Sequence, residues 1–468
     1  MKLARMLFRE YDVRGRVPEV FPEAKDELSD DGMRHLGRAF GTLARERGRD
    51  TVVVGYDLRT YSPRLSARFI EGLSAAGTNV LDIGCCLTPT LYFAQIHLQV
   101  PAGAMITASH NPQGWSGMKL ATDYVTTLGP DDIQRLRALC DAGPLARGTG
   151  TVKKVDVRPA YLADISSRVK PKRKLKVVLD CGNGTAAYFA VEAYERAGFE
   201  VVPLFCTPDA TFPNHFPNPS EQANHVAIRA KVRETGAELG LSFDGDGDRV
   251  GVEDERGEGV NADLVLLLLA RQVLARRPGS PVVFDVKCSQ ALVEDIAAHG
   301  GVPVMWKTRH SHIKAKMKET GAPIAGERSG HIFIKDGFHG FDDGLFAGLR
   351  LAEYVANEGQ SLSALLATAP QYVTSPEIHV DCADEVKYAV VDRLVAEMKR
   401  DYPGRVNDVN GARVAFDDGW GLVRASSNLP ELVLVFEGKT KEGMEAIKAE
   451  FRRRLAKHSE VGATWHNE

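Results

Sequence analysis

The chain has 468 residues, which is too long for one ordinary core and predicts three or four domains. Its composition, 44% hydrophobic and 26% charged, is typical of soluble globular proteins, and a formal net charge of -3 gives no reason to expect nucleic acid or an acidic membrane as a partner. The seven cysteines are scattered without a C-x-x-C pair, so they predict neither a disulfide framework nor a zinc site. The most apolar stretch, residues 264–270, is far shorter than the roughly 20 residues that span a bilayer. We therefore expect a cytoplasmic protein.

The first clear pattern begins with a β-rich run at residues 51–56. A helical stretch follows at about residues 63–76, and a second strand is expected at residues 79–83. Apolar runs of this length that are separated by a helix predict a βαβ unit.

The same pattern recurs twice. The second copy has a strand, a glycine-rich turn, a helix and a strand at residues 175–179, 181–184, 185–197 and 200–205. The third copy has a strand, a helix and a strand at residues 282–284, 289–299 and 302–306. Three such units at similar spacing predict three related α/β domains.

After about residue 370 the rhythm changes. Short strands joined by turns are expected at residues 377–380, 414–416, 421–424 and 432–436, and a helix with a basic end at residues 441–458. This pattern predicts an α+β domain with antiparallel strands. The expected fold therefore has three mixed α/β domains and a C-terminal α+β domain, at residues 1–153, 154–257, 258–370 and 371–468.

Three carboxylates follow an apolar run at alternate positions in D-G-D-G-D-R: Asp244, Asp246 and Asp248. Alternation in extended backbone points all three one way, and the intervening glycines let the oxygens converge. Converging carboxylates repel one another unless a cation lies between them, and Mg²⁺ is the preferred ion at a phosphate site. A solvated acidic turn is the alternative. A calcium loop of the EF-hand type is disfavoured, because Arg249 stands where such a loop needs glycine.

A small hydroxyl residue, Ser109, stands at the centre of T-A-S-H-N-P. The asparagine and proline favour a turn, so Ser109 is expected in an exposed loop, where it either presents a nucleophile or caps the turn. A serine hydrolase is the sharper alternative, but neighbours in extended backbone point to opposite faces, which places His110 poorly to take the serine proton. Lys119, ten residues on, is either a surface lysine or a charge directed at a phosphate.

Two later loops suit a phosphosugar. In G-E-R-S-G-H the alternating side chains of Glu327, Ser329 and His331 can bind vicinal hydroxyls, although a polar hairpin turn is equally open. In R-A-S-S-N, from Arg424 to Asn428, a guanidinium and small polar groups can cradle a phosphate or form an ordinary loop. Positive charge near strand ends of the third unit, where α/β sheets bind ligands, comes from Lys287, Lys307 and His310.

In this order, at about one per domain, these motifs resemble those of the α-D-phosphohexomutases. The resemblance covers essentially the whole chain and extends to Y-D-V-R-G at residues 11–15 and W-K-T-R-H at residues 306–310. It implies four domains around a central cleft. It also implies reversible phosphoryl transfer between O1 and O6 of glucose or mannose phosphates, through a phosphoserine and a hexose 1,6-bisphosphate.

The resemblance also implies residue roles. Ser109 is the phosphoserine and, with the three aspartates, a ligand of Mg²⁺. The implied catalytic residues are Ser109, His110, Lys119, Arg14, Arg249 and His310, with Lys119 or His310 as the base. The implied substrate contacts are Tyr11, Lys287, His310, Glu327, Ser329, His331, Arg424, Ser426, Ser427 and Asn428. The expected partner is a small phosphosugar, and the protein is expected to be a monomer.

One departure concerns the last loop, where the family reads R-A-S-N-T and this chain has Ser427 and Asn428. The role of Arg328, at the variable position of the sugar loop, stays open. The nearest alternative function is a phosphoglucosamine mutase, which usually carries R-P-S-G-T there. A serine hydrolase and a calcium-binding module are alternatives of other classes.

Overall fold

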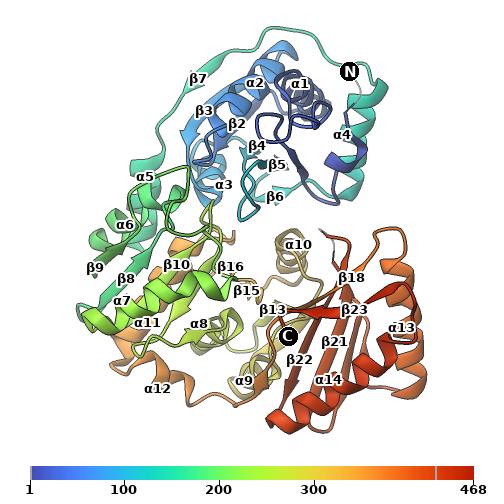
Figure 1. The fold of residues 1–468 in the computed structure, drawn as a ribbon. Coiled ribbons are helices and arrows are strands. Elements are labelled where there is room, and N and C mark those ends of the chain that lie inside the picture. Colours follow the sequence, from blue (N-terminus) through green and yellow to red (C-terminus); the bar gives the residue numbers. More distant parts are fainter. Residues whose placement is uncertain (1–2, 427–428) are drawn as a thin grey trace. The chain divides into compact units, whose positions relative to one another are not determined.

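The computed structural model describes residues 3–426 and 429–468 (Figure 1). The chain divides into two compact units. Unit 1 comprises Met1–Val265 and Ser329–Ser363, and unit 2 comprises Leu266–Arg328 and Ala364–Glu468. The chain passes between the units within helices α8 (Ala262–Arg276) and α12 (Leu362–Leu366), and again before strand β16 (Ile332–Ile334).

The first sheet of unit 1 has the strand order β1-β5-β4-β2-β3-β7, with β6 beside β5. Its strands are β1 (Val13–Arg16), β2 (Thr51–Tyr56), β3 (Asn79–Cys85), β4 (Ala102–Ile106), β5 (Trp115–Asp123), β6 (Thr126–Thr127) and β7 (Val152–Lys154). Strands β2, β3 and β4 are parallel, and β5 is antiparallel to β4 and β1. The central strand β2 is buried along most of its length, as expected for a parallel strand covered on both faces.

The helices of this domain are α1 (Asp30–Glu46), α2 (Ser62–Ala75), α3 (Thr88–His97) and α4 (Pro130–Ala142), after a 3₁₀ turn η1 (Arg5–Leu7). Helix α1 begins at a serine cap: Ser29 accepts a hydrogen bond from the Gly32 N–H, and two aspartates follow in the first turn, where they favour the helix dipole. Its apolar face, including Leu36 and Phe40, shares one core with Val52 and Val54 of β2. In Figure 1 helices α1 and α2 lie side by side.

The second sheet of unit 1 has the order β12-β11-β10-β8-β9. Its strands are β8 (Lys176–Asp180), β9 (Glu200–Leu204), β10 (Leu239–Phe243), β11 (Val250–Glu253) and β12 (Gly259–Val260), and its helices are α5 (Arg158–Ser167), α6 (Ala190–Arg196), α7 (Val226–Thr235) and α11 (Gly344–Glu358). The single helix expected at residues 185–197 is wrong in one respect. It is split into a 3₁₀ turn η2 (Thr185–Tyr188) and α6, because Phe189 leaves the helical region, at φ -126°, and buries its ring.

Unit 2 contains a third parallel set of strands, β13 (Pro281–Asp285), β14 (Val302–Trp306) and β15 (Ile324–Gly326), with helices α9 (Gln290–Ala298) and α10 (His310–Thr320). In all three parallel sets the first strand is central, the second strand lies on one side of it and the third on the other: β3-β2-β4, β9-β8-β10 and β14-β13-β15. This shared order confirms the prediction of three related α/β domains.

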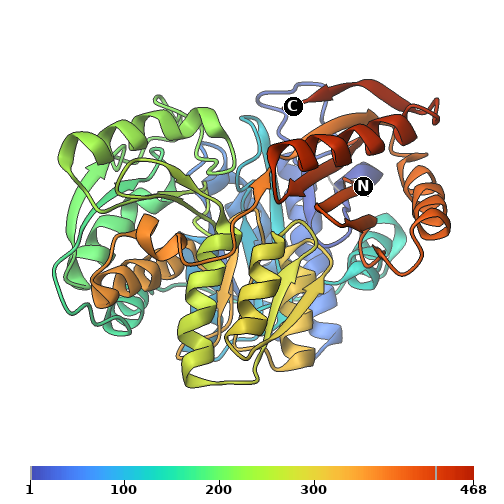
Figure 2. The same ribbon diagram turned by 90° about the horizontal axis from the view of Figure 1, so that it is seen from below.

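The C-terminal part of unit 2 is an antiparallel sheet of order β19-β20-β21-β22-β18-β23, with β17 beside β22. The strands are β17 (Val373–Thr374), β18 (Ile378–Cys382), β19 (Val406–Asn407), β20 (Ala412–Phe416), β21 (Gly419–Ala425), β22 (Glu431–Gly438) and β23 (Val461–His466). Helices α13 (Lys387–Asp401) and α14 (Lys441–Leu455) share a core with these strands, and Figure 2 shows α14, in red, lying along the sheet. The α+β prediction is confirmed.

Among the described residues, none of the helices combines the length and the apolar character that a bilayer crossing requires.

Candidate functional site

Ser109 lies in the loop after β4, and its backbone is left-handed, with φ of 51°. Its N–H donates to Oγ1 of Thr107 at 2.8 Å, and its hydroxyl donates to Oδ2 of Asp244 at 2.8 Å. The residue is only 3% exposed. The expectation of an exposed serine is therefore wrong, because the aspartate loop lies against the hydroxyl.

The sequence argument that His110 points away from Ser109 is also wrong. Nδ1 of His110 lies 3.1 Å from Oγ of Ser109. The argument assumed extended backbone, and a left-handed residue turns the next side chain back toward its own. Burial, followed by the charges of Arg249 and Arg14, holds the pKa of His110 well below its usual value. The imidazole is thus neutral at physiological pH.

Asp244, Asp246 and Asp248 follow strand β10 in one loop, and all three are fully buried. One carboxylate oxygen from each lies within 4.8 Å of the others. Burial, followed by the charges of Asp248 and Asp246, raises the pKa of Asp244 well above its usual value. The three carboxylates therefore repel one another, and a cation among them would relieve that repulsion.

The donor atoms of this cluster suit a hard cation. Within the described residues, the buried Oδ1 atoms of Asp246 and Asp248 have no hydrogen-bond partner, although buried polar atoms ordinarily have one. Carboxylate oxygens are the ligands that such cations prefer. A Cβ at Gly245 would lie 2.5 Å from the carbonyl oxygen of Ser109, so only glycine permits this approach of the two loops. The three aspartates thus fit the predicted metal site, and Ser109 lies beside them.

Lys119, on strand β5, is the buried counter-charge of the aspartate loop. Its Nζ donates to Oδ2 of Asp246 at 2.8 Å and also to Oδ2 of Asp248. Burial opposes the charge of Lys119, but the two carboxylates outweigh it and raise the pKa of the amine well above its usual value. The alternative of a surface lysine is wrong, and in this arrangement the amine is protonated.

Two threonines that the sequence reasoning did not single out contact the same carboxylate. Oγ1 of Thr88, the first residue of α3, donates to Oδ2 of Asp246 at 2.6 Å, and Oγ1 of Thr107 donates to the same atom at 3.2 Å. Thr88 follows the carboxyl end of the parallel strand β3, and α/β sheets bind ligands at such strand ends. That position was the one sequence signal that could have predicted Thr88 as a site residue. Thr107 belongs to the same motif as Ser109.

A second set of contacts joins Arg249, His331 and Asp342. Nε of Arg249 donates to Nε2 of His331 at 3.0 Å, and the Arg249 N–H donates to Oδ1 of Asp244 at 3.2 Å. Nδ1 of His331 lies 3.1 Å from Oδ2 of Asp342 and 3.6 Å from Oδ1 of Asp248. The structure thus brings two predicted residues to the aspartate loop and adds Asp342, which the sequence reasoning missed. The one sequence signal for Asp342 was that it belongs to a pair of acidic residues just before a helix.

The segment at Tyr11 to Arg14 also reaches the Ser109 loop. Nη1 of Arg14 donates to the carbonyl oxygen of Thr107 at 3.1 Å, and Nε donates to Oδ2 of Asp12 at 2.8 Å. Burial opposes the charge of Arg14, but Asp12 outweighs it and the pKa is raised. Tyr11 is 7% exposed, and its hydroxyl donates to Oε1 of Glu10 at 3.0 Å. Arg14 is therefore the member of this motif whose side chain contacts the Ser109 loop.

In unit 2 the predicted residues form a cationic cluster around one carboxylate, Glu377. Nζ of Lys287 donates to Oε1 of Glu377 at 2.5 Å. Burial raises the pKa of Glu377, but Lys287, Arg328 and Arg424 outweigh it and lower that pKa to about 2. Arg424 is 7% exposed, and its Nε donates to Oδ1 of Asn410 at 3.2 Å. Asp285 is a second acid near Lys287 and Arg424. The three cations outnumber the two acids, and this excess of positive charge suits an anion such as a phosphate.

The remaining predicted residues divide between the units. In unit 2, Oε1 of Glu327 accepts the N–H of Arg309 at 2.5 Å, directly before His310 begins helix α10. Ser426 is buried, and its hydroxyl accepts a backbone N–H from three residues on at 3.3 Å. Ser329 is half-buried and belongs to unit 1. The last two, Ser427 and Asn428, lie outside the described residues.

Arg328, whose role the sequence left open, is held by unit 2. Nη2 donates to Oγ1 of Thr374 and to the carbonyl oxygen of Ser375, both at 3.0 Å, and Nη1 donates to the carbonyl oxygen of Lys287 at 3.3 Å. Its guanidinium therefore ties the parallel strands of unit 2 to the antiparallel sheet.

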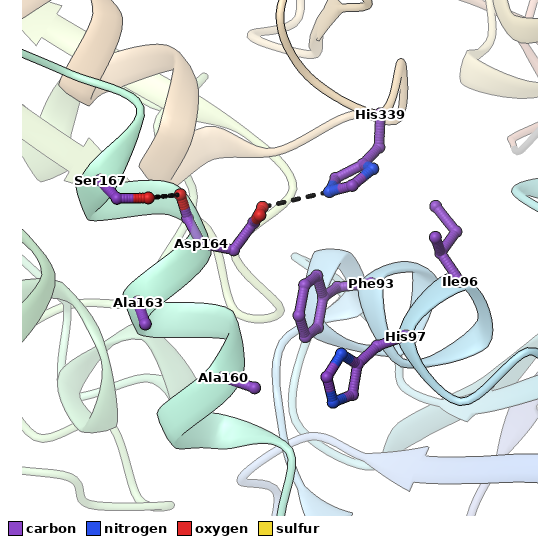
Figure 3. Close-up of a pocket in the computed structure, with 8 residues that line it drawn as sticks. All are labelled: Phe93, Ile96, His97, Ala160, Ala163, Asp164, Ser167 and His339. Atoms are coloured by element: carbon purple, nitrogen blue, oxygen red, sulfur yellow. Dashed lines mark hydrogen bonds and ion pairs between the residues drawn. The ribbon is translucent and has the colours of Figure 1, made fainter.

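A pocket of about 500 Å³ elsewhere in unit 1 contains none of these groups (Figure 3). It is lined mainly by helices α3 and α5 and has Phe93, His97 and His339 on its walls. Nε2 of His339 lies 3.1 Å from Oδ2 of Asp164, so these two side chains of the pocket wall are paired with each other. The chemistry of the chain is concentrated at the Ser109 loop instead.

Four family models match the chain in sequence order. They are described as the alpha/beta/alpha domains I, II and III and the C-terminal domain of phosphoglucomutase/phosphomannomutase, and they match residues 5–146, 159–257, 261–372 and 377–454. Together these matches extend over nearly the whole chain.

Whole-chain relatives agree with the models. A phosphomannomutase/phosphoglucomutase of Pseudomonas aeruginosa is 41% identical over 453 residues, which cover 97% of this chain and 96% of the relative. A phosphoglucomutase of Neisseria meningitidis is 40% identical and covers 96% of each chain. A solved structure of a phosphoglucomutase/phosphomannomutase family protein from Burkholderia thailandensis has a TM-score of 0.90 at 39% identity, with 97% of this chain and 98% of that chain covered.

Proposed function

The chain belongs to the phosphoglucomutase/phosphomannomutase family, and from that premise we propose that it moves a phosphoryl group reversibly between O1 and O6 of glucose or mannose phosphates. Phospho-Ser109 donates its group to the free hydroxyl of a hexose monophosphate. The resulting hexose 1,6-bisphosphate turns around and returns its other phosphate to Ser109. For this enzyme we also propose the four domain ranges given above. We propose that it acts as a monomer, since all groups in the scheme come from one chain. We propose that it is cytoplasmic, since its composition is that of a soluble globular protein.

The observation that carries this proposal is the position of the Ser109 hydroxyl against a buried cluster of three aspartates, at 2.8 Å from Asp244. A serine used only to cap a turn has no need of such neighbours. A phosphoserine does, because its phosphate oxygens can join the carboxylates in holding one cation.

We propose Mg²⁺ as that cation, held by Asp244, Asp246, Asp248 and the phosphate on Ser109. When bound, it would neutralise charge on the transferring phosphoryl group. The protein groups around the ion have the same role of neutralising charge. Lys119 and Arg249 are cations beside the aspartate loop, and they would stabilise negative charge on the phosphoryl oxygens.

The first transfer breaks the bond between phosphorus and Oγ of Ser109 and forms a bond between phosphorus and the sugar oxygen. A base takes the proton of the sugar hydroxyl, and Oγ takes up a proton as it leaves. The second transfer is the reverse exchange: it breaks the bond between the other phosphate and its sugar oxygen and forms the bond to Oγ. Of the two predicted bases, Lys119 is protonated in the arrangement found, which favours a role in charge stabilisation. His310 then stays the proposed base, and His110 is proposed to help hold Ser109 through its 3.1 Å contact with Oγ.

We propose that unit 2 binds the phosphate that is not reacting and contributes one of the sugar contacts. The cluster of Lys287, Arg328 and Arg424 supplies positive charge for that phosphate. Ser426 supplies a hydroxyl, and Ser427 and Asn428 are proposed to add polar donors. The proposed sugar contacts are Tyr11, Glu327, Ser329 and His331. A bisphosphate with similar ends can bind this site in either direction, which its turning in the cycle requires.

The test is to incubate the purified protein with glucose 1,6-bisphosphate and locate phosphate by peptide mass spectrometry. We expect phosphate on Ser109 in the wild type and none there in Ser109→Ala. Coupled assays with mannose, glucose and glucosamine 1-phosphates then separate this proposal from a phosphoglucosamine mutase. A serine hydrolase would keep its activity in EDTA and become acylated at Ser109. A calcium-binding module would bind Ca²⁺ and be unchanged by Ser109→Ala. A wild type without phosphate on Ser109 would contradict the proposal.

A further inference from the structure

We propose that Arg59 is a positioning residue, which fixes the backbone of the Ser109 loop so that the serine oxygen is aligned for phosphoryl transfer. This inference rests on the proposed function and names a part of the machinery in a different stretch of the chain, between strand β2 and helix α2.

The guanidinium of Arg59 is bonded to the main chain of the loop and is only 2% exposed. Nη2 donates to the carbonyl oxygens of Ser109 at 3.0 Å and Asn111 at 2.5 Å, and Nη1 donates to that of Pro112 at 3.1 Å. Nη1 also donates to the hydroxyl of Tyr61 at 3.2 Å. One side chain therefore satisfies three carbonyls within four residues of the catalytic loop.

Asp57 completes the clamp from the same turn. Its Oδ2 accepts the N–H of Ala108 at 3.2 Å and lies 3.6 Å from Nε of Arg59. Its Oδ1 accepts the hydroxyl of Ser62 at 2.5 Å, which fixes the carboxylate at the start of helix α2. The loop is thus held at an N–H before Ser109 and at the carbonyls of Ser109 and the residues after it.

The loop has a reason to need such a clamp. Ser109 has φ of 51°, a left-handed conformation that a residue with a Cβ adopts only at a cost of about 1 kcal/mol or more. Four charged or polar contacts from Asp57 and Arg59 can hold it there. Because Ser109 Oγ contacts Asp244 and His110, a relaxed backbone would move the oxygen away from both. A misplacement of about 1 Å can slow a transfer step by about 10²-fold.

The second domain of unit 1 covers the clamp. Cζ of Arg59 lies 5.2 Å from the ring centroid of Phe216 and 6.0 Å from that of Phe212. Both rings belong to the long segment between β9 and the 3₁₀ turn η3 (Gln222–His225). Nε2 of His215 lies 3.0 Å from Oδ2 of Asp180, at the end of β8, and fixes that segment. The aromatic cover keeps water from the guanidinium, which strengthens its bonds to the loop.

Because Arg59 touches only the backbone of the loop, its removal should slow transfer without removing a substrate contact. In Arg59→Met we expect kcat to fall by about 10²-fold, with KM within about 3-fold of wild type. Arg59→Lys, which can keep one carbonyl contact, should lose less. Phe216→Leu should lower kcat by about 3- to 10-fold, since it opens the cover while leaving the guanidinium in place.

The deciding readout is single-turnover phosphorylation of Ser109 by glucose 1,6-bisphosphate, followed by mass spectrometry. A positioning role predicts that Arg59→Met reaches the wild-type extent of phosphorylation, at a rate about 10²-fold lower. A merely structural role predicts the wild-type rate with a reduced extent, because only the folded fraction reacts. Arg64→Met is the matched control. Arg64 is an arginine of helix α2 that is about one-third exposed and ion-paired to Glu19, so its replacement should change neither value.

Wild-type phosphorylation rates in soluble Arg59→Met, or in Arg59→Lys and Phe216→Leu together if Arg59→Met does not fold, would overturn the inference. A wild type that takes up no phosphate on Ser109 would instead overturn the proposed function. The two failures are therefore distinguishable.

Discussion

Unit 1 gathers negative charge at its site, whereas unit 2 gathers positive charge. In unit 1 three buried aspartates converge beside Ser109, and Lys119 is the ammonium bonded to two of them. In unit 2 the acid Glu377 lies among the cations Lys287, Arg328 and Arg424. Under the proposed function, the difference would suit the two phosphates of a bisphosphate. The reacting phosphate needs a cation that can share its charge during transfer, and the other needs only a fixed anion site.

The largest effect is expected when the acidic site of unit 1 is disrupted. We expect EDTA to lower kcat/KM by on the order of 10³-fold and Mg²⁺ to restore it, because the aspartates repel one another without a cation. Asp246→Asn should show a similar loss that Mg²⁺ does not restore. Asp141→Asn, the same change at an exposed residue, is the control and should behave as wild type. Full activity in EDTA would show that no cation is needed.

The next effect tests the cationic site. Arg424→Lys keeps the charge but loses the planar fork that binds a phosphate through two hydrogen bonds, so we expect KM for the hexose phosphate to rise about 10- to 30-fold. The value of kcat should change by less than about 3-fold, because the phosphate bound there does not react. Steady-state kinetics measure both constants, with Arg405→Lys as the exposed control. A fall in kcat with KM unchanged would place Arg424 at the reacting end.

A smaller effect concerns stability in unit 1. Burial raises the pKa of Asp343 to about 7, from an ordinary value near 4. Between these values the folded chain keeps a proton that the unfolded chain has lost, so stability falls as pH rises toward 7. Asp343→Asn cannot ionise and keeps an acceptor for the Phe346 N–H. We expect it to gain about 1–3 kcal/mol over wild type between pH 5 and pH 8 in urea unfolding.

Asp209→Asn is the control for that measurement. Hydrogen bonds from the side chain and the backbone of Thr211 lower the pKa of Asp209 below its ordinary value, and so below the window tested. Its difference from wild type should therefore be the same at pH 5 and pH 8. An Asp343→Asn difference that is also constant would show that Asp343 is ionised throughout.

The smallest expected effect concerns stability in unit 2, where the change of stability with pH has the opposite sign. The pKa of Glu377 is lowered to about 2, so its contribution is complete above the ordinary value of about 4.5 and is lost as pH falls toward 2. Relative to Glu377→Gln, wild type should be more stable at pH 6 by at most about 1 kcal/mol, since the side chain is 31% exposed and solvent screens the pair. Urea unfolding at pH 6 and pH 3 should show that advantage shrinking with acid. An advantage that grows at pH 3 would refute it.

Much of the fold could be predicted because the first two parallel strands of each α/β domain are largely apolar runs with a helix between them. The helix at Lys387–Asp401 and the strand at Val461–His466 were not predicted. The strand has only half-buried and exposed positions and lies at the edge of its sheet, so it lacks the apolar signal of a buried strand.

The site residues could be predicted where they belong to one short sequence motif, as in the aspartate loop. It was not predictable where a contact depends on one backbone angle. The positive φ of Ser109 turned His110 toward the hydroxyl, and no propensity rule assigns that angle to serine. Thr88 and Asp342 were missed for another reason: each is an ordinary polar residue until the fold brings it to a carboxylate or an imidazole.

The most direct measurement follows one phosphate from Ser109 to sugar. The enzyme is labelled with ³²P from glucose 1,6-bisphosphate, freed of ligand, and mixed with glucose 1-phosphate in a single turnover. We expect the label to leave Ser109 and appear in hexose phosphate at a rate no slower than kcat. Label that stays on the protein, or that is released as inorganic phosphate, would contradict a phosphoserine carrier.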